Sequence, residues 1–484
     1  MPTTVPRIAL SPTLSIPRVV TGMWQIADME RDAGLVDPEA TAGAMADYHE
    51  AGLTAFDMAD HYGSAEEIAG RFAASGRRSE LLTKWVPKPG PITRAEVHAA
   101  VRRSLDRLRV DALDLLQFHA WSYSDPRWLD CLFWLSELRD LGLVRNLGLT
   151  NFDSAHLGMV LASGIPVVSN QVCWSLIDRR AGGRMSDLCE RTGVRLLTYG
   201  TLAGGLLTER WLGAPEPALE QLATWSQMKY ARFIHAAGGW SLFQNLLQAL
   251  ADVAGRRGVS IANVATRFVL DQPAVGAVIV GARLGERDHV ADTLRLFAFE
   301  LSPADRTRLE EAALGLDPLP GDCGDEYRRP PFLTASGDLS HHFDEFPAPY
   351  PIHVSAHGRV VATSGTRWEA IAGYGRAVRL GSRVLVSGTT ATHGDRLIGG
   401  ADPVAQTHFA IDKIEAALRS LGATLADVVR TRIYVTDRAH AEAISRAHGE
   451  RFRDILPANT LIRADLVGDG YLVEIEAEAE IRPA

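Results

Sequence analysis

The sequence contains few cysteines, no long hydrophobic run and no excess of positive charge. Its four cysteines, among 484 residues, form no C-x-x-C pair, which excludes the disulfide framework of small secreted domains. No apolar stretch has the length of a membrane-spanning helix, and the N-terminal stretch lacks the apolar core of a signal peptide. The net charge of −9 argues against a general nucleic-acid binder and a polybasic membrane anchor. We therefore expect a cytoplasmic protein that binds neither nucleic acids nor membranes.

What the sequence does contain is enough material for two domains. A chain of 484 residues exceeds the usual size of one domain, and 46 % of its residues are hydrophobic. A stretch rich in Pro, Gly, Asp and His, beginning "GDCGDEYRRPPFL", interrupts the regular pattern and indicates a linker. We predict a first domain over 1–320, a linker over 321–365 and a second domain over 366–484.

Strand-like runs alternate with helical patterns throughout the first domain. The runs lie at 19–24, 55–60, 81–85, 113–119, 144–151, 167–172, 194–200 and 277–282. Apolar residues recur at helical spacing between them, as in "TRAEVHAAVRRSLDRL". Eight strands, each followed by a helix, predict an α/β fold of the (β/α)8 TIM-barrel type. The connection at 208–241 is far longer than the others and predicts a large loop or extra helices over the barrel mouth.

The second domain has the pattern of a small α+β fold. Strand-like runs at 374–390, 428–437, 457–467 and 471–481 surround two helical stretches at 402–422 and 438–455. The last run alternates glutamates with Ile and Ala, which predicts a half-buried strand with one polar face.

Polar residues follow the predicted barrel strands at their C-terminal ends, where barrel enzymes keep their chemistry. Asp57 and Tyr62 follow the second strand, Lys84 ends the third and His119 ends the fourth. A lysine cation favours a nearby phenolate, an aspartate holds the lysine charged, and a histidine can hydrogen-bond a carbonyl oxygen. Each residue alone has a plain structural explanation, but all four on consecutive strand ends predict a general acid for a carbonyl that gains a hydride.

The first domain resembles the aldo-keto reductase family from about 15 to 316. The motifs "FDMADHYG", "LLTKW", "LDLLQFH", "LGLTNF", "SNQV", "YGTLAGGLL" and "VIVGAR" carry this resemblance. It implies an NAD(P)H-dependent oxidoreductase that interconverts a carbonyl and an alcohol. It further implies that Tyr62 is the proton donor, that Lys84 and Asp57 tune it, and that His119 orients the carbonyl.

The same resemblance implies a cofactor site, with NADPH favoured over NADH. Thr150, Asn151 and Gln171 would hold the nicotinamide carboxamide, and Tyr199 would stack on its ring. Arg283 lies where the family contacts the adenosine phosphate, and a cation there favours NADPH. The other implied cofactor residues are Gly22, Met23, Trp24, Asp57, Gly200, Leu202 and Gly281. His61, Trp85 and Trp121 flank the tetrad and are candidates for the substrate pocket, with structural packing the equal alternative for each tryptophan. No metal site is predicted.

The second domain resembles the RidA-like family, which includes enamine and imine deaminases. The resemblance rests on "GYGRAVRLGSRVLVSGT", "VVRTRIYVTD", "RFRDILPANTL" and "LVEIEAEAE". It implies a trimer-forming fold with clefts between subunits, marked by Tyr374, Asn459 and Glu474. Asn459 stands where the deaminases carry an arginine that pairs with a substrate carboxylate, and an asparagine cannot supply that charge. The resemblance makes a homo-oligomer the expected assembly.

Three functions remain open from the sequence. The first is an oxidoreductase acting on a small-molecule carbonyl or alcohol, with the second domain serving oligomerisation or ligand binding. The second is a bifunctional enzyme whose C-terminal domain processes a linked imine or enamine, an arrangement that tethering favours and Asn459 disfavours. The third is a regulatory protein that senses a nicotinamide nucleotide. The intact set of Asp57, Tyr62, Lys84 and His119 favours an enzyme, but it identifies neither the substrate nor the direction of reaction.

Overall fold

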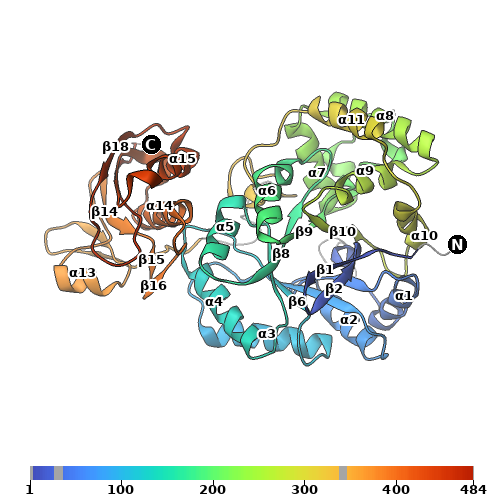
Figure 1. Cartoon of the computed structure of the whole chain (residues 1–484), viewed down its shortest axis with the longest axis horizontal. Coiled ribbons are helices and arrows are strands. Elements are labelled where there is room, and N and C mark those ends of the chain that lie inside the picture. Colours follow the sequence, from blue (N-terminus) through green and yellow to red (C-terminus); the bar gives the residue numbers. More distant parts are fainter. Residues whose placement is uncertain (1–3, 27–35, 337–345, 483–484) are drawn as a thin grey trace.

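The computed structural model describes residues 4–26, 36–336 and 346–482. The first domain is a closed barrel of parallel strands in the order β10-β3-β4-β5-β6-β7-β8-β9 (Figure 1). The strands are β3 (Val19–Gly22), β4 (Ala55–Asp57), β5 (Glu80–Trp85), β6 (Leu115–Phe118), β7 (Leu147–Thr150), β8 (Val167–Cys173), β9 (Arg195–Tyr199) and β10 (Val275–Gly281). The predicted (β/α)8 barrel and its eight strand positions are confirmed.

Helices surround this barrel and follow its strands. They are α1 (Pro38–Glu50), α2 (Ala65–Ala73), α3 (Arg94–Leu108), α4 (Arg127–Asp140), α5 (Ser154–Ala162), α6 (Arg184–Thr192), α7 (Trp225–Ala236), α8 (Trp240–Arg257), α9 (Ile261–Leu270), α10 (Val290–Leu294) and α11 (Pro303–Leu314). Helix α3 begins at a capping box between Thr93 and Glu96 and buries Val97, Val101 and Leu105 on one face. Among the described residues, no helix combines the length and the apolar character that crossing a membrane requires.

A hairpin that was not predicted closes the amino ends of the barrel strands. It consists of β1 (Arg7–Ser11) and β2 (Leu14–Pro17), which pair antiparallel. Leu10, Leu14 and Ile16 pack in one cluster with Leu82 and Leu197 from inside the barrel. Because this end is filled with aliphatic side chains, the chemistry is confined to the carboxyl ends of the strands.

The long connection after β9 forms extra helices, as predicted. It contains the 3-10 turns η5 (Glu209–Trp211) and η6 (Leu219–Gln221), and then α7 and the start of α8. The Trp24 indole, directly after β3, donates a hydrogen bond of 3.1 Å to the Ser226 hydroxyl in α7. This contact ties α7 to the carboxyl end of the barrel.

The second domain is a seven-stranded sheet with helices on one face, which confirms the α+β prediction. The sheet order is β11 (Ile352–Val354), β12 (Val360–Ala362), β13 (Ala377–Leu380), β14 (Arg383–Thr390), β19 (Val473–Glu480), β17 (Val428–Val435) and β18 (Ala458–Arg463). Helices α14 (Pro403–Ser420) and α15 (Ala441–Phe452) bury the Ile475, Ala477 and Ala479 face of β19. The alternating glutamates lie on the other face, as predicted.

The predicted linker at 321–365 has to be corrected at both ends. Its first part forms α12 (Asp325–Arg328), which packs at the barrel mouth. Its last part forms β11 and β12, and Val361 in β12 pairs with Val378 of the second sheet. These elements are only three or four residues long and lie among turn-forming residues. The hydrophobic periodicity of a helix or strand could therefore not be recognised in the sequence.

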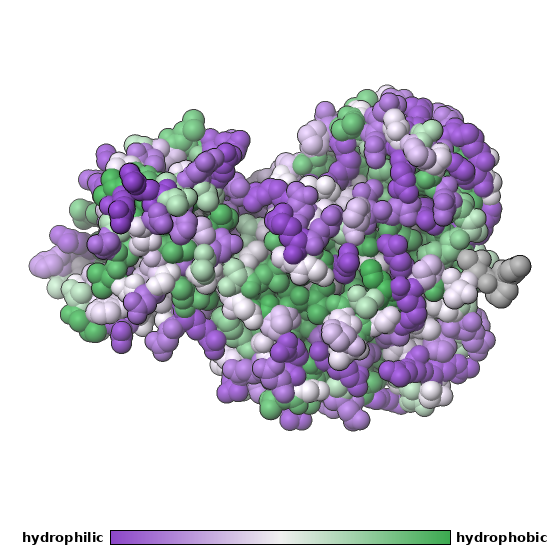
Figure 2. Space-filling model, in the orientation of Figure 1, coloured by the Kyte–Doolittle hydropathy of each residue, from purple (hydrophilic) through white to green (hydrophobic). Residues whose placement is uncertain are grey.

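The two domains form two lobes joined at a narrower waist (Figure 2). Helix α5 of the barrel packs against α14 of the second domain. Gly400 approaches the Ala162 carbonyl so closely that a Cβ would lie 2.7 Å from its oxygen. Ile398 and Phe409 belong to the same buried apolar cluster as the barrel core.

A buried histidine crosses this interface. The His156 imidazole lies 2.7 Å from Asp153 through Nδ1 and 2.9 Å from Asp412 through Nε2. Arg451 donates to the other Asp412 oxygen at 2.6 Å. Burial alone would lower the pKa of His156, but the two carboxylates outweigh it and raise that pKa to about 9. A charged network therefore holds the two domains together.

Candidate active site

The carboxyl ends of β4 and β5 bring two charged side chains into contact. Lys84 Nζ donates to Asp57 Oδ2 at 2.5 Å and to the Met58 carbonyl at 2.9 Å, and both side chains are buried. Burial lowers the pKa of Lys84, while the charge of Asp57 opposes this effect. Asp57 therefore opposes the loss of the Lys84 proton that burial favours.

A glutamine that was not predicted completes the surroundings of Asp57. Gln117 in β6 donates to Asp57 Oδ1 at 3.0 Å, and Gln171 in β8 donates to the same oxygen at 2.7 Å. Gln117 is fully buried inside the barrel. A polar residue within the apolar run "LDLLQFH" was the available signal, because a buried amide needs partners.

Tyr62 lies over Lys84 in the loop after β4. The Lys84 ammonium is 5.0 Å from the centre of the Tyr62 ring. Trp24 and His61 contact the same ring edge-on, at 4.8 and 4.9 Å between ring centres. The phenol, the cation and the carboxylate that were predicted from two neighbouring strand ends are thus brought together.

His119 stands on the next strand end. Its Nδ1 donates to the Thr150 carbonyl at 3.2 Å, because a carbonyl oxygen can only accept. Trp121 meets the imidazole edge-on, with ring centres 4.5 Å apart. The hydrogen bond to Thr150 fixes the ring and leaves Nε2 as the nitrogen not engaged by β7.

The residues expected to hold the nicotinamide lie together at the ends of β7, β8 and β9. The Tyr199 hydroxyl donates to Asn151 Oδ1 at 2.7 Å. Asn151 adopts a left-handed backbone, with φ of 58°, which asparagine tolerates better than most residues. Gln171 Nε2 donates to Asp57 and to Gln117 Oε1, so both of its hydrogens have acceptors.

The other expected cofactor residues follow the barrel edge. The Met23 amide donates to the Asp57 carbonyl at 2.9 Å, which places "Gly22-Met23" beside the tetrad. Gly200 has a φ of 76°, and a Cβ there would collide with the Tyr230 phenol. Arg283, in the loop after β10, lies 3.8 Å from Glu286. Leu202 is half-buried and Gly281 is exposed.

The three pocket candidates occupy different environments. Trp85 is buried and packs against Phe118, with ring centres 5.7 Å apart, as part of the apolar core. His61 is partly exposed and lies 3.0 Å from Asp60. Trp121 lies beside His119 and also faces Tyr327 of α12, 6.1 Å away. Packing accounts for Trp85, whereas His61 and Trp121 border the tetrad.

Two residues at this site escaped the sequence analysis. Tyr327 in α12 lies 5.9 Å from His119 between ring centres. Lys229 in α7 donates to the Tyr327 hydroxyl at 2.7 Å, and its ammonium is 5.1 Å from the Tyr199 ring. Neither residue lies at a strand end, so the rule that revealed the tetrad does not identify them.

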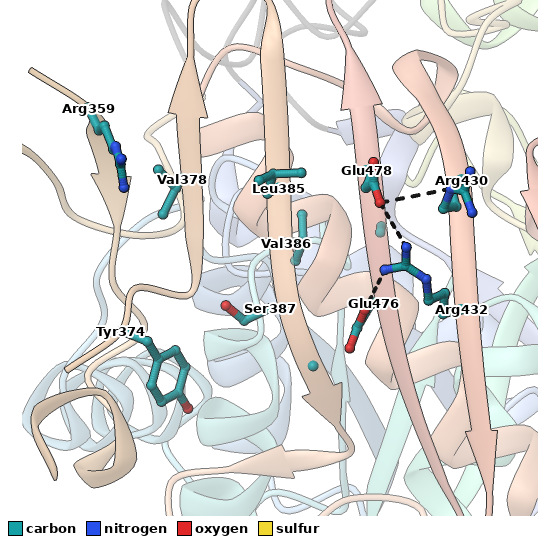
Figure 3. Close-up of a pocket in the computed structure, with 12 residues that line it drawn as sticks. Arg359, Tyr374, Val378, Leu385, Val386, Ser387, Arg430, Arg432, Glu476 and Glu478 are labelled. Atoms are coloured by element: carbon teal, nitrogen blue, oxygen red, sulfur yellow. Dashed lines mark hydrogen bonds and ion pairs between the residues drawn. The ribbon is translucent and has the colours of Figure 1, made fainter. Parts of the chain in front are cut away.

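The three residues predicted to mark a cleft between subunits of the second domain differ in their surroundings within the single chain. Tyr374 lines an open cavity of about 650 Å³ on the sheet face opposite α14 (Figure 3). Asn459 instead donates to Thr431 Oγ1 at 2.9 Å. Glu474 lies against Gly388, and burial and then Glu476 raise the pKa of Glu474. Of the three predicted residues, Tyr374 alone is among those that line the cavity.

The cavity contains charged residues that were not predicted. Arg432 pairs with Glu476 at 3.0 Å and with Glu478 at 3.3 Å, and Figure 3 shows these contacts across neighbouring strands. Arg359 and Arg430 also line it.

Comparisons with known proteins agree with this architecture. Residues 18–314 match the model of the Aldo/keto reductase family, and residues 358–481 match the family described as Endoribonuclease L-PSP. The chain is 27 % identical over 284 residues to the chloroplastic pyridoxal reductase of Arabidopsis thaliana, covering 54 % of this chain and 74 % of that protein. It is 22 % identical over 334 residues to the NADH-specific methylglyoxal reductase of Escherichia coli, covering 63 % and 97 %.

A solved structure is similar to the second domain. It is a Mycobacterium tuberculosis member of the YjgF/YER057c/UK114 family, 44 % identical, which covers 25 % of this chain and 99 % of its own, with a TM-score of 0.24. The family match covers more than half of this chain and coincides with the closed barrel that carries the tetrad. The chain therefore belongs to the aldo/keto reductase family of oxidoreductases, and it carries a RidA-like domain after its barrel.

Proposed function

We propose that the barrel transfers a hydride between a nicotinamide nucleotide and a carbonyl compound, with Tyr62 as general acid in reduction and general base in oxidation. The observation that carries this proposal is the buried Asp57–Lys84 ion pair of 2.5 Å, whose ammonium lies 5.0 Å from the Tyr62 ring. A cation so placed favours the phenolate that remains after proton donation.

The residues have separate tasks in this reaction. A nicotinamide nucleotide, when bound, would supply the hydride that the carbonyl carbon receives. The Tyr62 hydroxyl gives its proton to the oxygen that becomes the alcohol, and Lys84 stabilises the resulting phenolate. His119 would donate to the same oxygen through Nε2 as the imidazolium, in which both ring nitrogens carry a proton, because Nδ1 already donates to Thr150. In alcohol oxidation the same proton returns to Tyr62.

The donor set at β7, β8 and β9 suits the nicotinamide carboxamide. Gln171 donates both amide hydrogens to partners inside the barrel, Asp57 and Gln117. Its Oε1 is therefore the group that would accept a hydrogen bond from the carboxamide NH2. Asn151 accepts from Tyr199 through Oδ1, so its Nδ2 would donate to the carboxamide oxygen.

Arg283 supports a preference for NADPH, because its guanidinium suits a ribose phosphate. One relative is named NADH-specific, so the two nucleotides have to be compared directly.

The test is a titration with NADPH and with NADH, followed through tryptophan fluorescence and then through nucleotide absorbance with aldehydes and ketones. We expect binding and turnover in the wild type. Tyr62→Phe should keep its nucleotide affinity and lose turnover by roughly 10²–10⁴-fold. Full activity in that variant would contradict the role of Tyr62. Tight binding without turnover would favour a nucleotide sensor, and absence of binding would overturn the proposal.

For the RidA-like domain we propose a role in assembly with further copies of the chain. The outer sheet face exposes Leu385 and Ile462, at 47 and 48 % of their surface, and the barrel leaves this face uncovered because it docks on α14. Leu385→Glu and Ile462→Glu should lower the molar mass measured by light scattering. An unchanged molar mass in both variants would contradict a role of this face in assembly. Asn459 supplies no cation for a carboxylate, which is why assembly is proposed before deaminase chemistry.

A further inference from the structure

The segment that follows the barrel brings a second tyrosine to the tetrad. Tyr327 in α12 meets His119 and Trp121 edge-on, with ring centres 5.9 and 6.1 Å apart. Arg328 fixes this helix by donating to the Ala120 carbonyl at 2.5 Å and to the Asn151 carbonyl at 2.6 Å. Both carbonyls belong to loops that carry residues of the site, so α12 has a defined position beside His119.

The hydroxyl of Tyr327 is oriented by a lysine. Lys229 Nζ lies 2.7 Å from it, and an ammonium group can only donate. Tyr327 Oη is therefore the acceptor in this bond, and its own proton remains to be donated. Within residues 4–26, 36–336 and 346–482, no acceptor contacts that proton. A phenol that accepts from an ammonium is also a better donor, because hydrogen bonds polarise one another.

The charge around Lys229 is already balanced. Glu326 lies 3.5 Å from Lys229 and 2.8 Å from Arg180, which also pairs with Asp178 at 2.7 Å. Burial would raise the pKa of Glu326, but Arg180 and Lys229 outweigh it and lower that pKa to about 2. Two cations therefore face two carboxylates. A neutral oxygen suits this environment better than a further carboxylate, whose burial needs an unpaired cation.

We propose that Tyr327, held by Lys229, donates a hydrogen bond to a second oxygen of the substrate, whose reacting carbonyl lies at Tyr62 and His119. This inference rests on the proposed reductase function and names its substrate class. The substrate is a carbonyl compound that carries a neutral hydroxyl or oxo group close to the reacting carbonyl, such as an α-hydroxy ketone or an α-diketone. Tyr327 is a specificity-determining residue in this assignment, and Lys229 is its positioning residue.

The experiment compares substrates of matched size with and without the second oxygen. Hydroxyacetone is paired with butan-2-one, and butane-2,3-dione with 3-methylbutan-2-one, and kcat/KM is measured with saturating nucleotide. The preference is the ratio of kcat/KM for the oxygen-bearing substrate to kcat/KM for its partner. The intrinsic reactivities of the two substrates cancel when this ratio is compared between wild type and variant. Tyr327→Phe should reduce both preferences by about 3- to 10-fold, the range expected for one lost hydrogen bond. Lys229→Met should reduce them in the same direction.

Tyr230→Phe serves as the matched control. Tyr230 also faces Lys229, with 5.6 Å between the ammonium and its ring, but its hydroxyl contacts Cys173 instead of the His119 side. Its removal should leave both preferences within about twofold of the wild type, since no substrate hydrogen bond is lost. Thermal unfolding of each variant verifies that it is folded before its kinetics are compared.

Three results overturn the inference. The first is an equal loss of kcat/KM for both members of each pair in Tyr327→Phe, which assigns Tyr327 to packing. The second is unchanged preferences in Lys229→Met together with a raised nucleotide Kd, which assigns Lys229 to the cofactor. The third is the same fall in preference in Tyr230→Phe. Absence of nucleotide binding and of all turnover in the wild type overturns the proposed function itself, and so separates that failure from this one.

Discussion

At the scale of single residues, the carboxylate of Asp57 is the shared hydrogen-bond acceptor for side chains from three other barrel strands. It accepts hydrogen bonds from Lys84 on β5, Gln117 on β6 and Gln171 on β8. The ammonium of Lys84 is the only one of these three groups that carries a charge. Asp57 therefore decides the pH range over which Lys84 stays protonated beside Tyr62.

Removing the charge of Asp57 should move the pH profile. Burial lowers the pKa of Lys84 and Asp57 opposes this, so Asp57→Asn lowers that pKa further. Lys84 then loses its proton at lower pH, and the basic limb of the kcat/KM profile should shift to lower pH. Asp57→Asn also leaves a buried cation without its partner, which destabilises the fold by about 3–5 kcal/mol.

Asp60→Asn gives a graded comparison. Asp60 also raises the pKa of Lys84, but it ranks below Asp57 as a cause and is partly exposed. Its removal should shift the basic limb in the same direction and by less. Coincident basic limbs in Asp57→Asn and the wild type would show that Lys84 does not govern the profile.

Sequence reasoning found Asp57, Lys84 and His119 because parallel strands bring their carboxyl ends to one edge, whatever the details of packing. It did not find Gln117, which lies two residues before His119 and deeper in the barrel. In the sequence this residue appears only as one amide within an apolar run. Tyr327 was beyond its reach, because the place of a residue 208 positions after His119 depends on the path of the chain. The hairpin of β1 and β2 was also missed.

At the scale of elements, α12 depends on one arginine. Arg328 donates to the carbonyls of Ala120 and Asn151 and lies 4.3 Å from the centre of the Tyr123 ring. A helix of four residues is too short to show a hydrophobic periodicity in the sequence. Its own backbone hydrogen bonds are too few to stabilise it alone. The contacts of Arg328 are what position it.

Arg328→Met should therefore release α12 from the barrel. We expect faster amide hydrogen exchange over 319–336 and a higher KM, with a smaller effect on kcat, because Tyr62 and Lys84 are not displaced. Arg329→Met is the control, since Arg329 is exposed and, among the residues that the structure describes, its side chain pairs with Asp325 alone, at 3.5 Å. Equal exchange rates in Arg328→Met and Arg329→Met would contradict this account.

At the scale of the whole molecule, the interface between the domains contains a buried charge. The raised pKa of His156, about 9 against an ordinary value near 6.5, means that folding favours its protonated form. The resulting stability is fully present below about pH 6.5 and is lost as the pH rises through 9. The thermal unfolding midpoint should therefore fall across that interval.

His156→Gln should be less stable than the wild type at pH 6 and should lose most of this pH dependence. Glutamine can hydrogen-bond Asp153 or Asp412 but cannot neutralise them. His357→Gln, at an exposed position, is the control and should follow the wild-type curve. A wild-type midpoint that stays constant between pH 6.5 and 9 would show that His156 does not carry a proton at the interface.

The docking of α5 on α14 also determines how this protein can be divided. A flexible tether would let either half be produced alone, with only the local concentration of its neighbour changed. Here a cut between 319 and 350 would expose Ile398 and Phe409 to water and leave Asp412 without His156. Truncation at that boundary therefore leaves each domain with an exposed interface rather than with a surface suited to water. Exchange of either half for a homologue requires the α5 and α14 faces to be transferred as a pair.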